Sequence, residues 1–273
     1  MTRIDRRALF AKGGAAALLA ATGLSLEAAP SHGGVLRLAV PRDDSLSRVA
    51  RGAVFDTLTE VAPDGTLRGE LATAWRSGDN ARVWEFDLRT DVRFHDGHLL
   101  TSHDVANVMS PLGRVEPTGP LSIRVELDRP DPGLPFLLSA DPFAVKRPGE
   151  EYAPIAQANG TGCYRVDRAQ DDRHFRASRV AGHYKSGLAG WVDSLELIVI
   201  PDAGIRAEAL RDGFVDVAAL PSPSSMRRHS EFRFFPSATD MALAVSPAVG
   251  LPNRIGTRAP LDDGRIAERW WMI

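Results

Sequence analysis

Residues 84–105, WEFDLRTDVRFHDGHLLTSHDV, carry the pattern that decides the fold. Over residues 84–88 apolar side chains alternate with charged ones, which is typical of a β-strand with one buried face. A turn at residues 90–91 separates this strand from a second, shorter alternation at Val92 and Phe94. The first half of the stretch therefore predicts two successive strands.

The second half of the stretch predicts a turn followed by a helix. Gly97 ends the second strand, because glycine adopts backbone angles that other residues resist. Thr101 or Ser102 is a suitable helix N-cap, and Asp104 would lie in the first turn, where a carboxylate meets the positive end of the helix dipole.

Composition narrows the class of protein. The chain has 273 residues, of which 44% are hydrophobic and 25% charged, so it can bury a sizeable core. Its net charge of −2 argues against a nucleic-acid partner, since such domains usually carry a basic excess. A single cysteine, Cys163, excludes an intramolecular disulfide and a cysteine-rich metal site.

The N-terminus has the layout of an export signal. Residues 1–29 run from a basic start through an apolar stretch at residues 13–24 to small residues at Ala28 and Ala29. Arg6-Arg7 within this start is typical of a twin-arginine signal peptide. This layout predicts an exported, periplasmic protein, and the alternative is an amphipathic helix belonging to the mature chain.

A βαβ unit is predicted near the end of the regular pattern. Apolar residues 195–200 form a strand, and Asp202 then caps a helix over residues 203–211 that stops at Gly213. Residues 214–218 follow as another strand, so this spacing indicates a parallel sheet. Further strands are expected over four ranges: 35–40, 123–127, 232–235 and 241–245.

Several segments together resemble one known family. Residues 84–105 are similar to the pattern W-x-F-x-L-R-x-x-V-x-F-x-D-G-x-x-L-T-A-x-D-V of the extracytoplasmic solute-binding proteins of ABC transporters. This family is typified by dipeptide, oligopeptide and nickel receptors. Other segments that resemble it are FDTL at 55–58, ELATAW at 70–75, GTGCY at 160–164, HY at 183–184 with WVDSLELIVIPD at 191–202, and ALRDGFVDVA at 209–218.

The resemblance implies an α/β fold of the type II periplasmic-binding-protein kind, with a mixed sheet and flanking helices. After the signal peptide that the layout of residues 1–29 predicts, the resemblance implies a first lobe over residues 30–240 with a small subdomain at about residues 67–148. Residues 241–273 would form a hinge and the start of a second lobe, where the chain looks truncated. The implied function is a non-enzymatic receptor without a cofactor that captures a small polar solute, such as a short peptide, and delivers it to membrane permease subunits.

Ligand-binding candidates follow from the same resemblance. They lie on the loop after the first strand, on the glycine loop and at the hinge: Asp43, Asp44, Ser45, Asn159, Thr161, Tyr164, Thr239 and Asp240. Each could instead cap a turn, a role that suits Asp, Asn, Ser and Thr equally well. The two glycines around Thr161 would let the backbone approach either a neighbouring strand or a ligand.

Three other interpretations stay open. A metal site at His95, His98 and His103 would need ligands that a glycine turn and a helix start do not obviously bring to one face, so we expect no metal. The chain could be a truncated paralogue or gene fragment that binds no solute and serves at most as an interaction surface. A hydrolase is a more distant alternative, because no catalytic motif is present.

Overall fold

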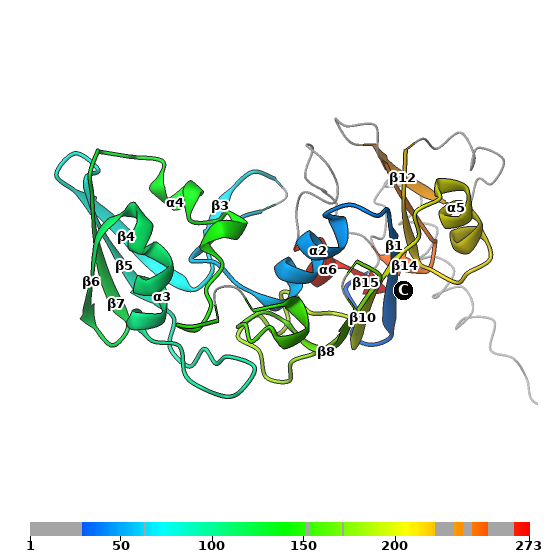
Figure 1. Cartoon of the computed structure of the whole chain (residues 1–273), viewed down its shortest axis with the longest axis horizontal. Coiled ribbons are helices and arrows are strands. Elements are labelled where there is room, and N and C mark those ends of the chain that lie inside the picture. Colours follow the sequence, from blue (N-terminus) through cyan, green and yellow to red (C-terminus); the bar gives the residue numbers. More distant parts are fainter. Residues whose placement is uncertain are drawn as a thin grey trace, which may run out of the picture.

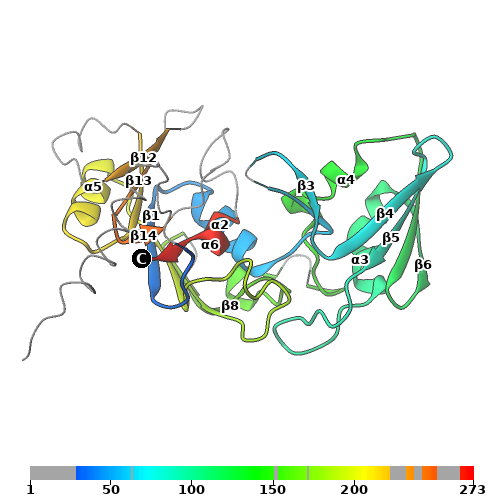
Figure 2. The same cartoon turned by 180° about the vertical axis from the view of Figure 1, so that it is seen from behind.

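The computed structural model describes residues 29–62, 64–150, 153–170, 172–221, 232–236, 242–250 and 265–273. The predicted signal peptide, except Ala29, and the hinge candidates Thr239 and Asp240 lie outside these described residues. Two separate sheets organise the chain, one at each end of an elongated molecule (Figures 1 and 2). Among the described residues, no helix is long and apolar enough to span a lipid bilayer.

The larger sheet has seven strands and mixed polarity. Its order is β12-β13-β11-β1-β10-β9-β8, with β1 parallel to both β10 and β11 and the other pairs antiparallel. This confirms the predicted mixed sheet. The strands are β1 (Val35–Val40), β8 (Tyr164–Gln170), β9 (His174–Arg179), β10 (Ser194–Val199), β11 (Val217–Leu220), β12 (Arg233–Pro236) and β13 (Ala242–Val245).

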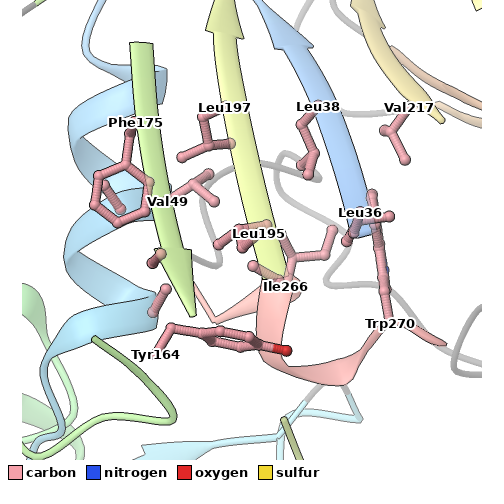
Figure 3. Close-up of a cluster of buried hydrophobic side chains, with 14 of the residues drawn as sticks. Leu36, Leu38, Val49, Tyr164, Phe175, Leu195, Leu197, Val217, Ile266 and Trp270 are labelled. Atoms are coloured by element: carbon pink, nitrogen blue, oxygen red, sulfur yellow. The ribbon is translucent and has the colours of Figure 1, made fainter. Parts of the chain in front are cut away.

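Helices cover both faces of this sheet. Helix α2 (Ser45–Val54) buries Leu46, Val49 and Ala53, which recur with helical spacing, in the same cluster as Leu38. Helix α5 (Ala203–Arg211) packs with Ala39 in a separate cluster. Leu38 and Ala39 are adjacent in β1 and point to opposite faces of the sheet, so α5 covers the face opposite to α2. Side chains from α2, the strands and the segment after Arg265 meet in the main core (Figure 3).

The predicted βαβ unit is confirmed. The Asp202 side chain accepts a hydrogen bond from the Ile205 amide at 2.9 Å, which caps α5 as expected. Strand β11 begins at Val217, three residues later than predicted, because Phe214 and Val215 still bond to the end of α5 through the carbonyl of Ala209.

The smaller sheet has four antiparallel strands in the order β4-β5-β7-β6. Its members are β4 (Ala72–Gly78), β5 (Val83–Leu88), β6 (Gly113–Gly119) and β7 (Ser122–Leu127). In β5 the buried positions are Trp84, Phe86 and Leu88, as their alternation predicts. These residues form a second core with helix α3 (Ser102–Met109), whose Val105 and Met109 are buried.

The cap of α3 is more elaborate than expected, and one predicted strand is absent. Thr101 and Asp104 form a capping box in which the Asp104 carboxylate accepts both the amide and the hydroxyl of Thr101, at 2.8 and 2.7 Å. The second strand predicted at Val92 and Phe94 is wrong. Both side chains are buried, but their backbone forms only an isolated bridge between Arg93 and Leu99.

Short elements complete the described chain. Strands β2 (Thr59–Val61) and β3 (Leu67–Gly69) form a hairpin, and α4 (Leu134–Leu137) packs against β2. Helix α6 (Ile266–Arg269) lies beside α2, and β15 (Trp271–Met272) pairs with β14 (Val249–Gly250) (Figures 1 and 2). We call residues Arg265–Ile273 the α6–β15 segment.

Candidate functional site

The carboxyl edge of the parallel strands is the first candidate site. The chain leaves β1 for α2 on one face of the sheet, and it leaves β10 for α5 on the other face before returning as β11 on the far side of β1. The strand order therefore reverses at β1. Crevices at such switch points, outside the carboxyl ends of the strands, are the usual ligand sites of open α/β sheets.

Asp43, Asp44 and Ser45 lie at this edge. The carboxylate of Asp43 accepts the Ser45 amide at 2.8 Å, and Asp44 forms an ion pair with Arg48 at 2.5 Å. Both aspartates are exposed, whereas Ser45 begins helix α2 and is buried. Two exposed carboxylates at a helix start are thus held by local bonds, as their turn-capping alternative also predicts.

Arg206 lies at the same edge and was missed by sequence reasoning. Its guanidinium donates to the carbonyls of Ala219 at 2.6 Å, Ile200 at 2.5 Å and Pro201 at 2.9 Å. Burial lowers the pKa of Arg206, and the charge of Asp202 opposes this shift. Arg206 therefore ties the ends of β10 and β11 together. Its signal in the sequence was an arginine on the buried side of a helix.

The glycine loop approaches helix α2, whereas the sequence predicted an approach to a neighbouring strand or to a ligand. A Cβ on Gly160 would lie 2.0 Å from the carbonyl oxygen of Val54, and one on Gly162 would lie 2.6 Å from that of Ala53. The Gly162 amide donates to the Val54 carbonyl at 2.8 Å. The close approach is therefore to the C-terminal end of α2.

Asn159, Thr161 and Tyr164 are engaged inside the protein. Asn159 exchanges two hydrogen bonds with Asp96, at 3.2 and 2.9 Å. The Thr161 hydroxyl donates to Asp56 at 3.0 Å. The Tyr164 hydroxyl donates to the Val192 carbonyl at 3.2 Å, and burial raises the pKa of this phenol.

The structure does not bring the two groups of candidates together. Asp43–Ser45 lie at the start of α2, whereas the glycine loop lies at its end. Ten residues of helix separate them, a length of about 15 Å.

The glycine loop meets the turn of the opening sequence stretch, in what we call the junction between the sheets. The His95 amide donates to the Gly160 carbonyl at 2.9 Å, and the His95 ring bonds to the Gly162 carbonyl, also at 2.9 Å. His98 lies 3.0 Å from the carboxylate of Asp96. Among the described residues, no group of three or more His, Cys, Asp or Glu side chains is placed so that it could hold a metal ion. His103 lies exposed on α3.

A buried charge cluster stands beside the junction and was also missed. We define the cluster by four acids and two bases: Asp56, Glu60, Glu70, Glu268, Lys185 and Arg265. All except Glu60 are at most 9% exposed.

Lys185 is at the centre of the cluster. Its ammonium lies 3.3 Å from Asp56 and 3.2 Å from Glu268, and it also contacts Glu70. Arg265 contacts Glu70 as well, and donates to the Thr57 hydroxyl at 2.7 Å. These contacts join the α6–β15 segment to the chain that connects the two sheets.

The pKa shifts of the cluster follow from burial and from these ion pairs. Burial alone would raise the pKa of Asp56, but the charges of Lys185 and Arg265 outweigh it and lower that pKa to about 2. Burial would lower the pKa of Lys185, but Asp56 and Glu268 outweigh it and raise that pKa. Lys185 and Asp56 are therefore charged throughout the physiological pH range.

Comparisons with known proteins agree with the fold. Residues 66–246 match the family described as bacterial extracellular solute-binding proteins, family 5. A probable di/tripeptide-binding protein of Pseudomonas aeruginosa is 24% identical over 253 residues, which cover 76% of this chain and 46% of that protein.

Solved structures show the same architecture. The Helicobacter pylori periplasmic binding protein DppA, in complex with the peptide STSA, aligns with a TM-score of 0.65 and 19% identity, over 75% of this chain and 50% of that one. The A. tumefaciens R10 protein AgaA, in complex with agropinic acid, aligns with a TM-score of 0.67 and 19% identity, over 74% of this chain and 48% of AgaA. The chain thus spans about half the length of these proteins.

Proposed function

Since this chain belongs to the bacterial extracellular solute-binding proteins of family 5, we propose that it is a solute-binding part of an ABC importer's receptor. In this proposal it captures a small polar solute, such as a short peptide, outside the cytoplasm and delivers it to membrane permease subunits. The relatives named above are binding proteins, and we propose binding rather than catalysis for this chain as well.

The observation that carries this proposal is the switch point at the carboxyl edge of β1, β10 and β11. We propose that the solute contacts Asp43, Asp44 and Ser45 there. Two exposed carboxylates suit a cationic group such as a peptide amine, and charge-assisted hydrogen bonds strengthen when water is excluded. Thr239 and Asp240 remain proposed contacts at the hinge.

The glycine-loop candidates have a different proposed role. Asn159, Thr161 and Tyr164 would reach a solute only by giving up the internal hydrogen bonds described above. We therefore propose that they support the site by fixing the junction and the end of α2.

The remaining organisation is proposed from the sequence pattern. We propose that residues 1–29 direct export by the twin-arginine route and that residues 30–240 form the first lobe. Residues 67–148 would be its subdomain, and residues 241–273 the hinge and the start of a second lobe. The intact mass of the protein purified from the periplasm of its host checks whether residues 1–29 act as an export signal, because their removal is expected.

A thermal-shift experiment with a panel of di- to pentapeptides tests the function. A ligand at 100 times its dissociation constant stabilises a protein by about 2.7 kcal/mol, which for a chain of this size is a rise in Tm of about 5–10 °C. We expect the double variant Asp43→Asn/Asp44→Asn to lose this rise, and the control Asp128→Asn, which is exposed beside the four-stranded sheet, to keep it.

The alternatives predict other outcomes. A non-binding paralogue or fragment would show no rise with any peptide. Peptide cleavage during the incubation, detected by mass spectrometry, would instead favour a hydrolase.

A further inference from the structure

The charge cluster contains more acids than bases. Among the described residues, four carboxyl groups share two cations, and the three buried ones, Asp56, Glu70 and Glu268, still outnumber the bases where water is excluded. Buried charge that is not matched by opposite charge is costly, and a carboxyl group can remove that cost by binding a proton. One member of the cluster is therefore expected to hold a proton.

Glu268 is the member whose surroundings suit the protonated form. It is 2% exposed, its Oε2 accepts the Lys185 ammonium at 3.2 Å, and the Cys163 thiol also forms a hydrogen bond with the carboxyl group. The other oxygen, Oε1, is buried without a hydrogen-bond partner. By contrast, Asp56 and Glu70 use both oxygens, since Asp56 also accepts from Thr161 and Glu70 from Thr57.

The titratable and charged groups around Glu268 come from every element packed on α6. They are Lys185 and His183 on the loop after β9, Tyr184 on the same loop, Cys163 and Tyr164 at the start of β8, Asp56 after α2, Glu60 on β2, Glu70 after β3, and Arg265 on its own segment. The His183 ring donates through Nε2 to the Thr161 carbonyl at 2.7 Å and accepts the Lys185 amide at Nδ1, at 3.1 Å.

We propose that Glu268 acts as a protonation latch on the α6–β15 segment, so that the segment is held more firmly at acidic pH than at neutral or alkaline pH. Opening of the segment would break both apolar contacts and a backbone hydrogen bond. Ile266, Ala267 and Trp270 are buried in the main core, and the Glu268 carbonyl accepts the Gly190 amide at 2.8 Å. Ionisation of Glu268 raises the excess negative charge of the cluster from one unit to two, which favours opening.

The direction of the pKa shift agrees with this geometry. Burial raises the pKa of Glu268 above its ordinary value of 4.5, and the carboxylates of Asp56 and Glu60 add to the rise, while Lys185 and Arg265 oppose it. A raised folded-state pKa contributes stability that is complete below pH 4.5 and is lost as the pH rises through the folded-state pKa. The lowered pKa of Asp56 acts only in stronger acid, near pH 2 to 4.

Hydrogen exchange at pH 5.0, 6.5 and 8.0 tests the latch. Protection factors, which remove the intrinsic pH dependence of exchange, report the opening equilibrium of the α6–β15 segment and of the Gly190 amide. In the unchanged chain, we expect this opening constant to rise with pH, by at most tenfold per pH unit for one proton. In Glu268→Gln it should be independent of pH, while the exposed control Glu116→Gln should behave like the unchanged chain.

A second variant guards against a folding defect in Glu268→Gln. Glu60→Gln removes a nearby negative charge from a partly exposed side chain, so the pH dependence should move to lower pH without disappearing. A rise with pH that survives unchanged in Glu268→Gln would overturn the proposal and assign the effect to another group, such as His183. A flat profile in the unchanged chain would also overturn it.

Discussion

Removal of the Lys185 ammonium should be among the most destabilising single changes in this protein. Its nitrogen is within 4.0 Å of four carboxyl groups, those of Asp56, Glu60, Glu70 and Glu268. At an effective dielectric constant of about 20, one pair at 3.3 Å has an attraction of about 5 kcal/mol. The cost of burying the charges offsets much of this attraction while the pair is intact.

Lys185→Met removes the attraction but leaves the carboxylates buried. Breaking a buried pair in this way typically costs about 3–5 kcal/mol, against a total stability of about 5–15 kcal/mol for a native domain. We therefore expect Lys185→Met to lose 3–5 kcal/mol in urea unfolding at pH 7, followed by tryptophan fluorescence. The loss should shrink as the pH falls, because the carboxylates then bind protons.

Two control variants make the measurement decisive. Lys185→Arg keeps the charge and should recover part of the loss. Arg114→Met breaks an exposed pair with Glu116 and should cost no more than about 1 kcal/mol. If Lys185→Met lost less than 1 kcal/mol at pH 7, the cluster would not hold the chain together as its geometry indicates.

Two further predictions concern the glycine loop. Gly160→Ala should lower stability by about 1–3 kcal/mol in the same assay, because its Cβ would overlap the Val54 carbonyl. Gly78→Ala is the matched control, because a Cβ there would meet nothing within 4 Å. Equal losses of stability in the two variants would contradict the close approach. Cys163 is 1% exposed, and burial raises the pKa of its thiol. At pH 8 the thiol of the folded protein should therefore react with a disulfide reagent far more slowly than that of the protein unfolded in urea. Equal rates would show that the glycine loop opens freely.

Local sequence patterns were sufficient for most of the fold. The alternation at residues 84–88 and the cap at Asp202 each involve neighbours in the chain, and the structure confirms both. The failure at Val92 and Phe94 has a physical cause. Two buried alternate residues satisfy the pattern of a strand, but a strand also needs a partner for its backbone, which here is a single bridge.

The buried charge cluster was less predictable because it depends on pairings between distant parts of the chain. Arg265 contacts Glu70, and Lys185 contacts Asp56, although these residues are far apart in the sequence. No periodicity links such segments. A usable signal was the presence of charged residues inside apolar motifs, as in FDTL and ELATAW, where a surface position would be unexpected.

The placement of β1 has a consequence for how the protein is made. Val35 pairs with Ser194 and Leu38 with Val217, so the central strand of the larger sheet is synthesised long before either of its neighbours exists. The four-stranded sheet, in contrast, is complete once residue 127 has emerged. Non-local pairing is slow and leaves unpaired apolar strands open to aggregation. On the ribosome the middle of the chain can therefore fold first, while β1 stays without its neighbouring strands until β10 and β11 have been synthesised.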